Sequence, residues 1–421
     1  MYNNKFYVVQ DGEFVNPNTN HLFSNGLDPK DFIVNQDGER YNFVGFIFNS
    51  EKILISFPKH SFSSTDLEKL PQNSVMLNKY IRILFNCIKR TVNNRNDKYV
   101  GIRNELNSDY PFIDFLEVYK YYKRYGLFTN EKEIKKFGYA GRISWKDTMN
   151  KSPKIINNHN LLFLPLIIKE NIEQHVFISK CMAYVIDSTL ERFSLFLEGE
   201  KTNLHTRDID FSNTSLVITQ LKKVKRTLFK NIHQHLVDSL ISFFEQEKTK
   251  GGNYQLKIYS FHLIWESMIK EYLRTKFYGL NDRLEIEWSD SARNNHFEKK
   301  VAYPDMRGMN GFSIEPDYYL ILNNKRYIFD AKYYQKLTKL DYKQVAYYFL
   351  LKHFETNRDV NGNIINELET YNALILPTEY EIYSEVHFEL NPEYNVNESK
   401  FVIMAYYLNT LKVMEHYTNA N

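Results

Sequence analysis

Three residues in the last third of the chain have the types and spacing that phosphodiester hydrolysis requires. Asp317 follows a proline, Asp330 comes after a short turn, and Lys332 lies two residues further on. The anionic phosphate repels a nucleophile, and a divalent cation overcomes this by neutralising charge and lowering the pKa of a bound water. Magnesium commonly takes one or two carboxylate ligands. A neighbouring ammonium can orient the water or stabilise the transition state.

The residues around Asp317, Asp330 and Lys332 predict a hairpin that places the three side chains close together. Apolar strands are expected at 317–322 and 326–333, joined by a tight turn at 323–325. Side chains alternate faces along a strand, so Asp330 and Lys332 should point the same way, and the hairpin should bring Asp317 close to Asp330. The alternative is an ion pair on an edge strand. The preceding Pro-Asp, the apolar strands and a helix after the lysine favour a site.

A third acid could complete the metal site. Glu266 lies on a predicted helix upstream of the hairpin, at 261–273, and its carboxylate could reach the metal or its waters. The alternative is a surface glutamate beside Trp265. Glu315 and Asp305 are spare acids that could replace a named ligand.

The helix expected at 341–354 follows the lysine. Gln344 and Tyr348 are four residues apart and therefore share a helix face. We expect that face to lean over the site and contact the DNA backbone or the attacked phosphate. Asp341 is predicted to be the N-cap of this helix.

The whole chain is predicted to be an α+β multidomain protein. We expect a β-rich N-terminal domain at 1–130, a helical connector at 131–250 and an α/β nuclease core with a mixed sheet at 251–421. Further predicted strands and helices are a hairpin at 42–49 and 52–57, a strand at 161–168, helices at 75–92, 110–125, 175–198, 215–247 and 254–277, and strands at 371–376 and 400–407.

Composition narrows the class of protein. The net charge is only +3, so any nucleic-acid surface must be local. Two distant cysteines, Cys87 and Cys181, make neither a disulfide framework nor a zinc site, and they fit a reducing compartment. No signal peptide and no apolar run of about 18 residues is visible. We therefore expect a cytoplasmic protein without a membrane span.

The sequence resembles the PD-(D/E)xK nuclease superfamily and, within it, the McrC-like subunits of the LlaJI restriction family. The resemblance is carried by Trp265-Glu266, Pro316-Asp317, Asp330-Ala331-Lys332, and Gln344 with Tyr348. Blocks at 57–59 and 141–148 are similar as well.

This resemblance implies more than the spacing does. It implies a DNA endonuclease with Mg²⁺, for which Mn²⁺ can substitute, held by Asp317, Asp330 and Glu266. It also implies a McrB-like AAA+ GTPase partner that docks on residues 1–130. The chain contains no GxxxxGK[ST] phosphate loop, so we expect no nucleotide site in it and a motor on a separate protein. Cutting two strands usually needs two active sites, so dimerisation is a further expectation.

Two other functions remain open. One is a self-sufficient nuclease for repair or transposition, against which the long N-terminal region without a DNA-reading motif argues mildly. The other is an inert nuclease-fold module that regulates a partner NTPase. Inert copies tend to lose an acid or the lysine, and this chain retains all of them.

Overall fold

The computed structural model divides an α+β chain into two compact units. Unit 1 comprises Met1–Tyr110, Leu195–Leu197 and Lys250–Asn421, and unit 2 comprises Pro111–Ser194 and Glu198–Thr249. The structure describes residues 5–49, 52–93, 106–157, 160–247, 254–289, 291, 294–352, 357–358, 364–366, 368–394 and 401–419. Most of the first and all of the third predicted domain thus contribute to unit 1. The boundary predicted at 250/251 lies outside the described residues.

The first sheet of unit 1 is built mainly from the N-terminal residues. Its five strands lie in the order β1 (Lys5–Gln10), β5 (Lys52–Phe57), β4 (Val44–Asn49), β12 (Tyr254–Ile258) and β6 (Leu106–Ser108). Strands β4 and β5 form the predicted antiparallel hairpin, and β1 pairs with β5 in parallel. One face carries a buried cluster that includes Val9, Ile47 and Leu54.

Strand β12 corrects one prediction. The helix expected at 254–277 is wrong for its first five residues, which pair with β4 and β6, and helix α10 (Phe261–Lys276) begins only after Ser260. The fully buried ammonium of Lys257 in β12 lies 2.6 Å from the buried carboxylate of Asp31. These partners are distant in sequence, so local periodicity could not reveal the strand.

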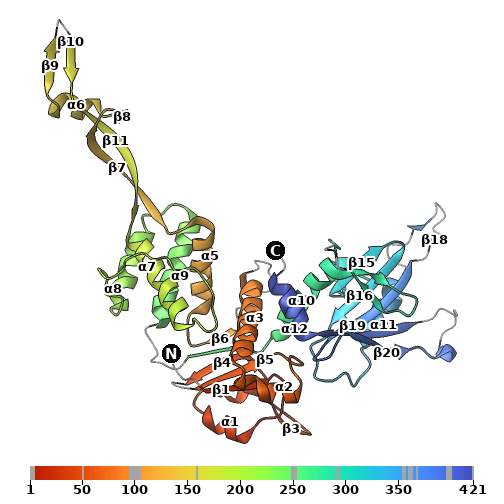
Figure 1. Ribbon diagram of the computed structural model, residues 1–421. Coiled ribbons are helices and arrows are strands. Elements are labelled where there is room, and N and C mark those ends of the chain that lie inside the picture. The colour runs from red at the N-terminus through yellow and green to blue at the C-terminus, as the bar shows by residue number, and fades with distance from the viewer. Residues whose placement is uncertain are drawn as a thin grey trace. The chain divides into compact units, whose positions relative to one another are not determined.

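The second sheet of unit 1 is mixed, as predicted for the C-terminal region (Figure 1). Its order is β15 (Tyr318–Leu322), β16 (Lys325–Ala331), β19 (Glu369–Thr378), β21 (Val402–Asn409) and β20 (Tyr383–Glu389). The three central strands are parallel and the two outer ones antiparallel to their neighbours. Helix α11 (Tyr342–Leu351) packs on β16 and β19, and α12 (Thr410–Asn419) packs on α10.

The hairpin β15–β16 is closed by two residues, Asn323 and Asn324. Both have positive φ, 52° and 61°, which asparagine tolerates and which a tight two-residue hairpin turn requires. The register that follows pairs Tyr318 with Phe329. The predicted tight turn is therefore confirmed at Asn323 and Asn324, whereas Lys325, which was assigned to it, is the first residue of β16.

The remaining elements of unit 1 surround the two sheets. Helix α3 (Ser74–Asn93) confirms the helix expected at 75–92 and packs on α10 and α12. The others are α1 (Pro17–Leu22), η1 (Pro29–Asp31), β2 (Phe32–Asn35), β3 (Gly38–Tyr41), α2 (Ser64–Lys69), η2 (Leu70–Gln72), β13 (Phe277–Leu280), β14 (Ile286–Trp288), η4 (Gly308–Asn310), β17 (Asn357–Arg358), β18 (Ile364–Asn366) and η5 (Pro392–Tyr394).

Unit 2 combines a helical bundle with a β-ribbon (Figure 1). Its elements are α5 (Phe112–Tyr125), β7 (Thr129–Gly138), β8 (Arg142–Ile143), α6 (Trp145–Lys151), β9 (Lys154–Asn157), β10 (Asn160–Phe163), β11 (Leu166–His175), α7 (Phe177–Arg192), α8 (Thr214–Lys225) and α9 (Asn231–Glu247). Strands β7 and β11 pair over ten residues each. Two predicted elements were too long. The strand expected at 161–168 is divided between β10 and β11, and the helix expected at 215–247 is divided into α8 and α9. Backbone bonds from Thr227 and Leu228 to the carbonyls three residues before them end α8.

Among the residues that the structure describes, no helix is long and apolar enough to cross a membrane.

The close approach of β4 and β12 yields a test of the first sheet. Gly45 has φ of +143°, and a Cβ there would lie 1.9 Å from the backbone oxygen of Leu256. We expect Gly45→Ala to lower the free energy of unfolding by on the order of 3–5 kcal/mol, because the strands must separate. Urea denaturation measures this. Gly279→Ala is the matched control, since a Cβ there meets nothing within 4 Å; equal losses in both variants would contradict the pairing.

Candidate nuclease site

The hairpin register sets two carboxylates opposite each other. Tyr318 pairs with Phe329, so the next positions outward along the two strands are Asp317 and Asp330. The two carboxyl groups lie within hydrogen-bond reach of each other. Asp330 is buried, at 5% exposed, and the Asp317 side chain is partly buried, at 14% exposed.

Asp317 is held by a backbone bond and faces a third acid. Its Oδ2 accepts a hydrogen bond from the backbone N–H of Ala331 at 3.2 Å. Burial raises the pKa of Asp317, and the nearby Glu266 carboxylate raises it further. The Tyr318 hydroxyl donates to the carbonyl of Glu266 at 2.7 Å, which ties α10 to the start of β15. The structure therefore brings Glu266 near Asp317.

Lys332 joins the acid pair to helix α11. Its Nζ lies 2.5 Å from an Asp330 carboxylate oxygen and 3.0 Å from one of Asp341. Burial lowers the pKa of Lys332, yet these two carboxylates outweigh burial and raise it above its usual value. Burial and Asp317 raise the pKa of Asp330 against the opposing effect of Lys332. The lysine is thus a fixed ammonium, while burial and neighbouring carboxylates disfavour ionisation of the two acids.

Asp341 has the predicted capping role as well. Its side chain accepts from the backbone N–H of Gln344 at the start of α11. One carboxylate therefore caps the helix and binds Lys332, a second contact that the sequence did not reveal.

Gln344 and Tyr348 lie in the interior. Gln344 is fully buried, and its side-chain oxygen accepts from the Asn372 amide at 3.1 Å. Tyr348 is 7% exposed and packs on Phe401, with ring centroids 4.3 Å apart. The structure does not bring these two side chains to the surface of the site, and their contact with DNA stays a prediction.

Tyr347 was not singled out from the sequence, although it faces the acids. Its hydroxyl donates to the Glu315 carbonyl at 3.1 Å. Burial raises the pKa of Tyr347, and Asp330 and Asp317 add to the rise, so the hydroxyl stays protonated. The motif spacing pointed to the neighbouring tyrosine, and nothing in the local sequence distinguishes the two.

Lys299 is a second cation that sequence reasoning missed. Its Nζ lies 3.6 Å from Asp317 and 3.9 Å from Glu315. A lone backbone bridge between Glu298 and Tyr319 places this segment beside β15. No periodic pattern marks such a contact. The other spare acid, Asp305, is bound by Arg307 and by two backbone N–H groups of its own loop.

The residues present fit a hard divalent cation. Among the described residues, no group of three or more His, Cys, Asp or Glu side chains is arranged as a metal cluster. Magnesium does not require one, since it is often bound by one or two carboxylates and completes its shell with water and phosphate. Burial and neighbouring carboxylates raise the pKa of both carboxyl groups, and a bound cation would stabilise their ionised form.

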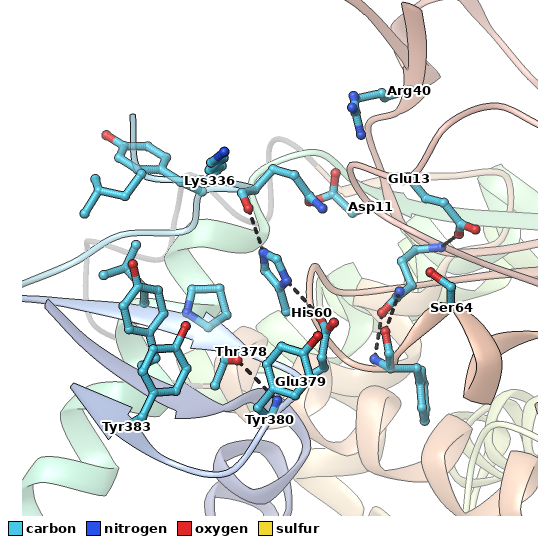
Figure 2. Close-up of a pocket in the computed structure, with 18 of the residues that line it drawn as sticks. Asp11, Glu13, Arg40, His60, Ser64, Lys336, Thr378, Glu379, Tyr380 and Tyr383 are labelled. Atoms are coloured by element: carbon cyan, nitrogen blue, oxygen red, sulfur yellow. Dashed lines mark hydrogen bonds and ion pairs between the residues drawn. The ribbon is translucent and has the colours of Figure 1, made fainter. Parts of the chain in front are cut away.

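A separate cavity of about 470 Å³ lies elsewhere in unit 1 (Figure 2). Its lining includes Glu13, Arg40, His60, Lys336 and Glu379. Asp317, Asp330 and Lys332 are not among the described residues that line this cavity. The cavity is therefore distinct from the acid pair.

A family model, LlaJI restriction endonuclease, matches residues 43–390. The chain belongs to the LlaJI restriction endonuclease family. This match covers β15, β16 and α11, so the acid pair and Lys332 lie within the family region.

Comparisons with solved structures and with curated proteins add little to this family assignment. A solved structure, the refined half-complex from a tetradecameric assembly of Thermococcus gammatolerans McrB AAA+ hexamers with bound McrC, is similar over 98% of both chains, at 12% identity and a TM-score of 0.39. A TM-score this low does not establish a shared fold. No curated protein matches this LlaJI-family chain.

The acid pair predicts a pH dependence of stability in the metal-free protein. Folding raises the pKa of Asp317, so its ionisation opposes folding: the penalty is absent below the ordinary aspartate pKa, about 4, and grows as pH rises through the folded value. We expect Asp317→Asn to raise Tm at pH 8 in the presence of a chelator and to leave Tm unchanged near pH 3.5.

Asp305→Asn is the control of opposite sign. Hydrogen bonds from Arg307 lower the pKa of Asp305, so its ionised form favours folding, and the variant should lose stability at pH 8. Calorimetric melting at the two pH values measures both variants. A fall in Tm at pH 8 for Asp317→Asn would contradict the acid-pair interpretation.

Proposed function

We propose that this chain is the Mg²⁺-dependent DNA endonuclease subunit of a restriction system, with a PD-(D/E)xK nuclease core formed by its C-terminal sheet. The observation that carries the proposal is the contact of Asp317 with the buried Asp330 next to Lys332. Membership of the LlaJI restriction endonuclease family supports it. Defence against invading DNA is the biological role this implies.

Asp317 and Asp330 would hold the metal, with Glu266 acting directly or through water. When bound, Mg²⁺ would neutralise phosphate charge and lower the pKa of a water molecule. The contacts of Asp317 with the Ala331 N–H and of Asp330 with Lys332 fix both carboxylates before substrate arrives. Little reorganisation is then needed on binding.

Lys332 would stabilise charge rather than accept a proton. Its raised pKa keeps the ammonium protonated at neutral pH, which excludes it as a general base there. Held by Asp330 and Asp341, the ammonium is placed to bind the attacking water or a phosphate oxygen. Lys299, 3.6 Å from Asp317, supplies a second positive charge at the same edge.

Contact with the DNA backbone was predicted for Gln344 and Tyr348. Both are buried, so direct contact would require them to leave the interior of the sheet–helix interface. We propose that Tyr347 is the better candidate for a phosphate contact, because its hydroxyl lies beside the acids. Gln344 and Tyr348 would then support that hydroxyl by fixing α11 on β19 and β21.

A McrB-like AAA+ GTPase is the proposed partner, and residues 1–130 are the proposed docking region, as the sequence resemblance implies. Unit 2 offers a further surface for a protein partner. The hairpin β9–β10 exposes Ile156, Leu161 and Leu162, at 78%, 52% and 48%. Clustered exposed apolar side chains are typical of interaction sites. Two copies of the chain would supply the two active sites that double-strand cleavage needs.

Cleavage of plasmid DNA tests the proposal. With Mg²⁺, the AAA+ partner and GTP, the wild type should cut, and Asp330→Ala should cut at least about 1,000-fold more slowly, because a metal ligand is lost. Asp305→Ala is the matched control, since this acid is engaged by Arg307 in its own loop, and it should retain cleavage.

Control reactions with the chain alone, and a calorimetric metal titration, distinguish the two alternative functions. Brisk cleavage by the chain alone would favour a self-sufficient nuclease. Absence of both cleavage and calorimetric metal binding would favour an inert regulatory module. Undiminished cleavage by Asp330→Ala would refute the proposed site.

A further inference from the structure

The segment that follows Lys332 has contacts on both sides of the site. Residues 332–341 connect β16 to α11 without a helix or strand, and their two ends meet in the ion pair of Lys332 with Asp341. The backbone N–H of Lys332 still donates to the Ile375 carbonyl at 2.8 Å, continuing the sheet. Among the described residues, those of this segment after Lys332 make no further sheet hydrogen bond, so side-chain contacts with neighbouring segments fix their position.

Tyr333, the residue next to the lysine, is held by the N-terminal part of unit 1. Its hydroxyl accepts from the backbone N–H of Lys59 at 2.7 Å. The same hydroxyl lies within hydrogen-bond reach of the Asp11 carboxylate, which is itself paired with the Lys59 ammonium at 2.9 Å. The Lys59 ammonium also lies 4.4 Å from the centre of the Tyr333 ring, and Phe261 packs on that ring.

His60 and Gly12 also contact the segment 332–341, both at Gln335 (Figure 2). The His60 ring lies between the Glu379 carboxylate, at 3.1 Å, and the Gln335 carbonyl oxygen, at 3.0 Å. A carbonyl oxygen only accepts, so His60 Nε2 donates this bond. At Gly12, whose φ is +84°, a Cβ would come within 2.3 Å of the Gln335 side-chain oxygen.

These contacts join the first sheet to the nuclease lysine. We propose that Tyr333 is a positioning residue, through which Asp11 and Lys59 set the place of the Lys332 ammonium at the acid pair. The inference rests on the proposed nuclease function and adds that the N-terminal sheet is part of the working site. The 470 Å³ cavity beside Tyr334 and Leu337 leaves the segment room to shift when these contacts change.

A pair of neighbouring tyrosines provides the test. Tyr333→Phe removes the hydroxyl that contacts Asp11 and Lys59, whereas Tyr334→Phe removes one from a ring that is 46% exposed. In the full chain with Mg²⁺, partner and GTP, we expect Tyr333→Phe to lower kcat about 10- to 100-fold, as displaced catalytic groups do. KM for DNA should be unchanged, and Tyr334→Phe should match the wild type.

A second readout does not depend on cleavage. In protein with ¹³C-labelled lysine, the Lys332 side-chain NMR signal is assigned by its loss in Lys332→Arg. It should shift in Tyr333→Phe and stay in place in Tyr334→Phe. Asp11→Asn preserves the shape of the contact and should move the same signal, which keeps the test decisive if Tyr333→Phe fails to fold.

The outcomes distinguish the two proposals. A Lys332 signal that moves in neither Tyr333→Phe nor Asp11→Asn would overturn the positioning role, as would an unchanged kcat in a well-folded Tyr333→Phe. If the wild type does not cleave DNA under any condition, the proposed function fails, and the NMR signal alone decides whether Tyr333 positions Lys332.

Discussion

The opposition of Asp317 and Asp330 is the constraint on which the rest of the site depends. Burial disfavours ionisation of both carboxyl groups, and the two repel each other when ionised, so both pKa values rise. The ionised form of such a pair is stabilised by positive charge nearby. Lys332 and Lys299 supply part of it from two sides, and a divalent cation would supply the remainder.

Strand β16 explains how helix α11 is fixed relative to this pair. At one end of the strand, the fully buried Arg326 donates to the carbonyl oxygens of Leu351 and Lys352, where α11 ends. Directly after its other end, Lys332 binds Asp341, where α11 begins. A single strand therefore holds both ends of the helix, and the same strand carries Asp330. Tyr347 is placed beside the acids as a consequence.

Local sequence chemistry predicted the features that depend on neighbouring residues. Alternation along two apolar strands and an asparagine turn were enough to oppose Asp317 and Asp330, and the capping role of Asp341 followed from its place before a helix. Contacts between distant segments could not be predicted in this way. Lys299 reaches Asp317 through one isolated bridge, and Tyr254–Ile258 became a strand because a sheet from the start of the chain offered it partners.

The central claim is that the opposed aspartates form a metal site. Anomalous diffraction from crystals soaked in Mn²⁺ tests it directly, because manganese has a strong anomalous signal and occupies magnesium sites. The account predicts one strong peak between Asp317 and Asp330, with a carboxylate oxygen of each within bonding distance. A peak only at other acids, or none at this pair under saturating Mn²⁺, would contradict it.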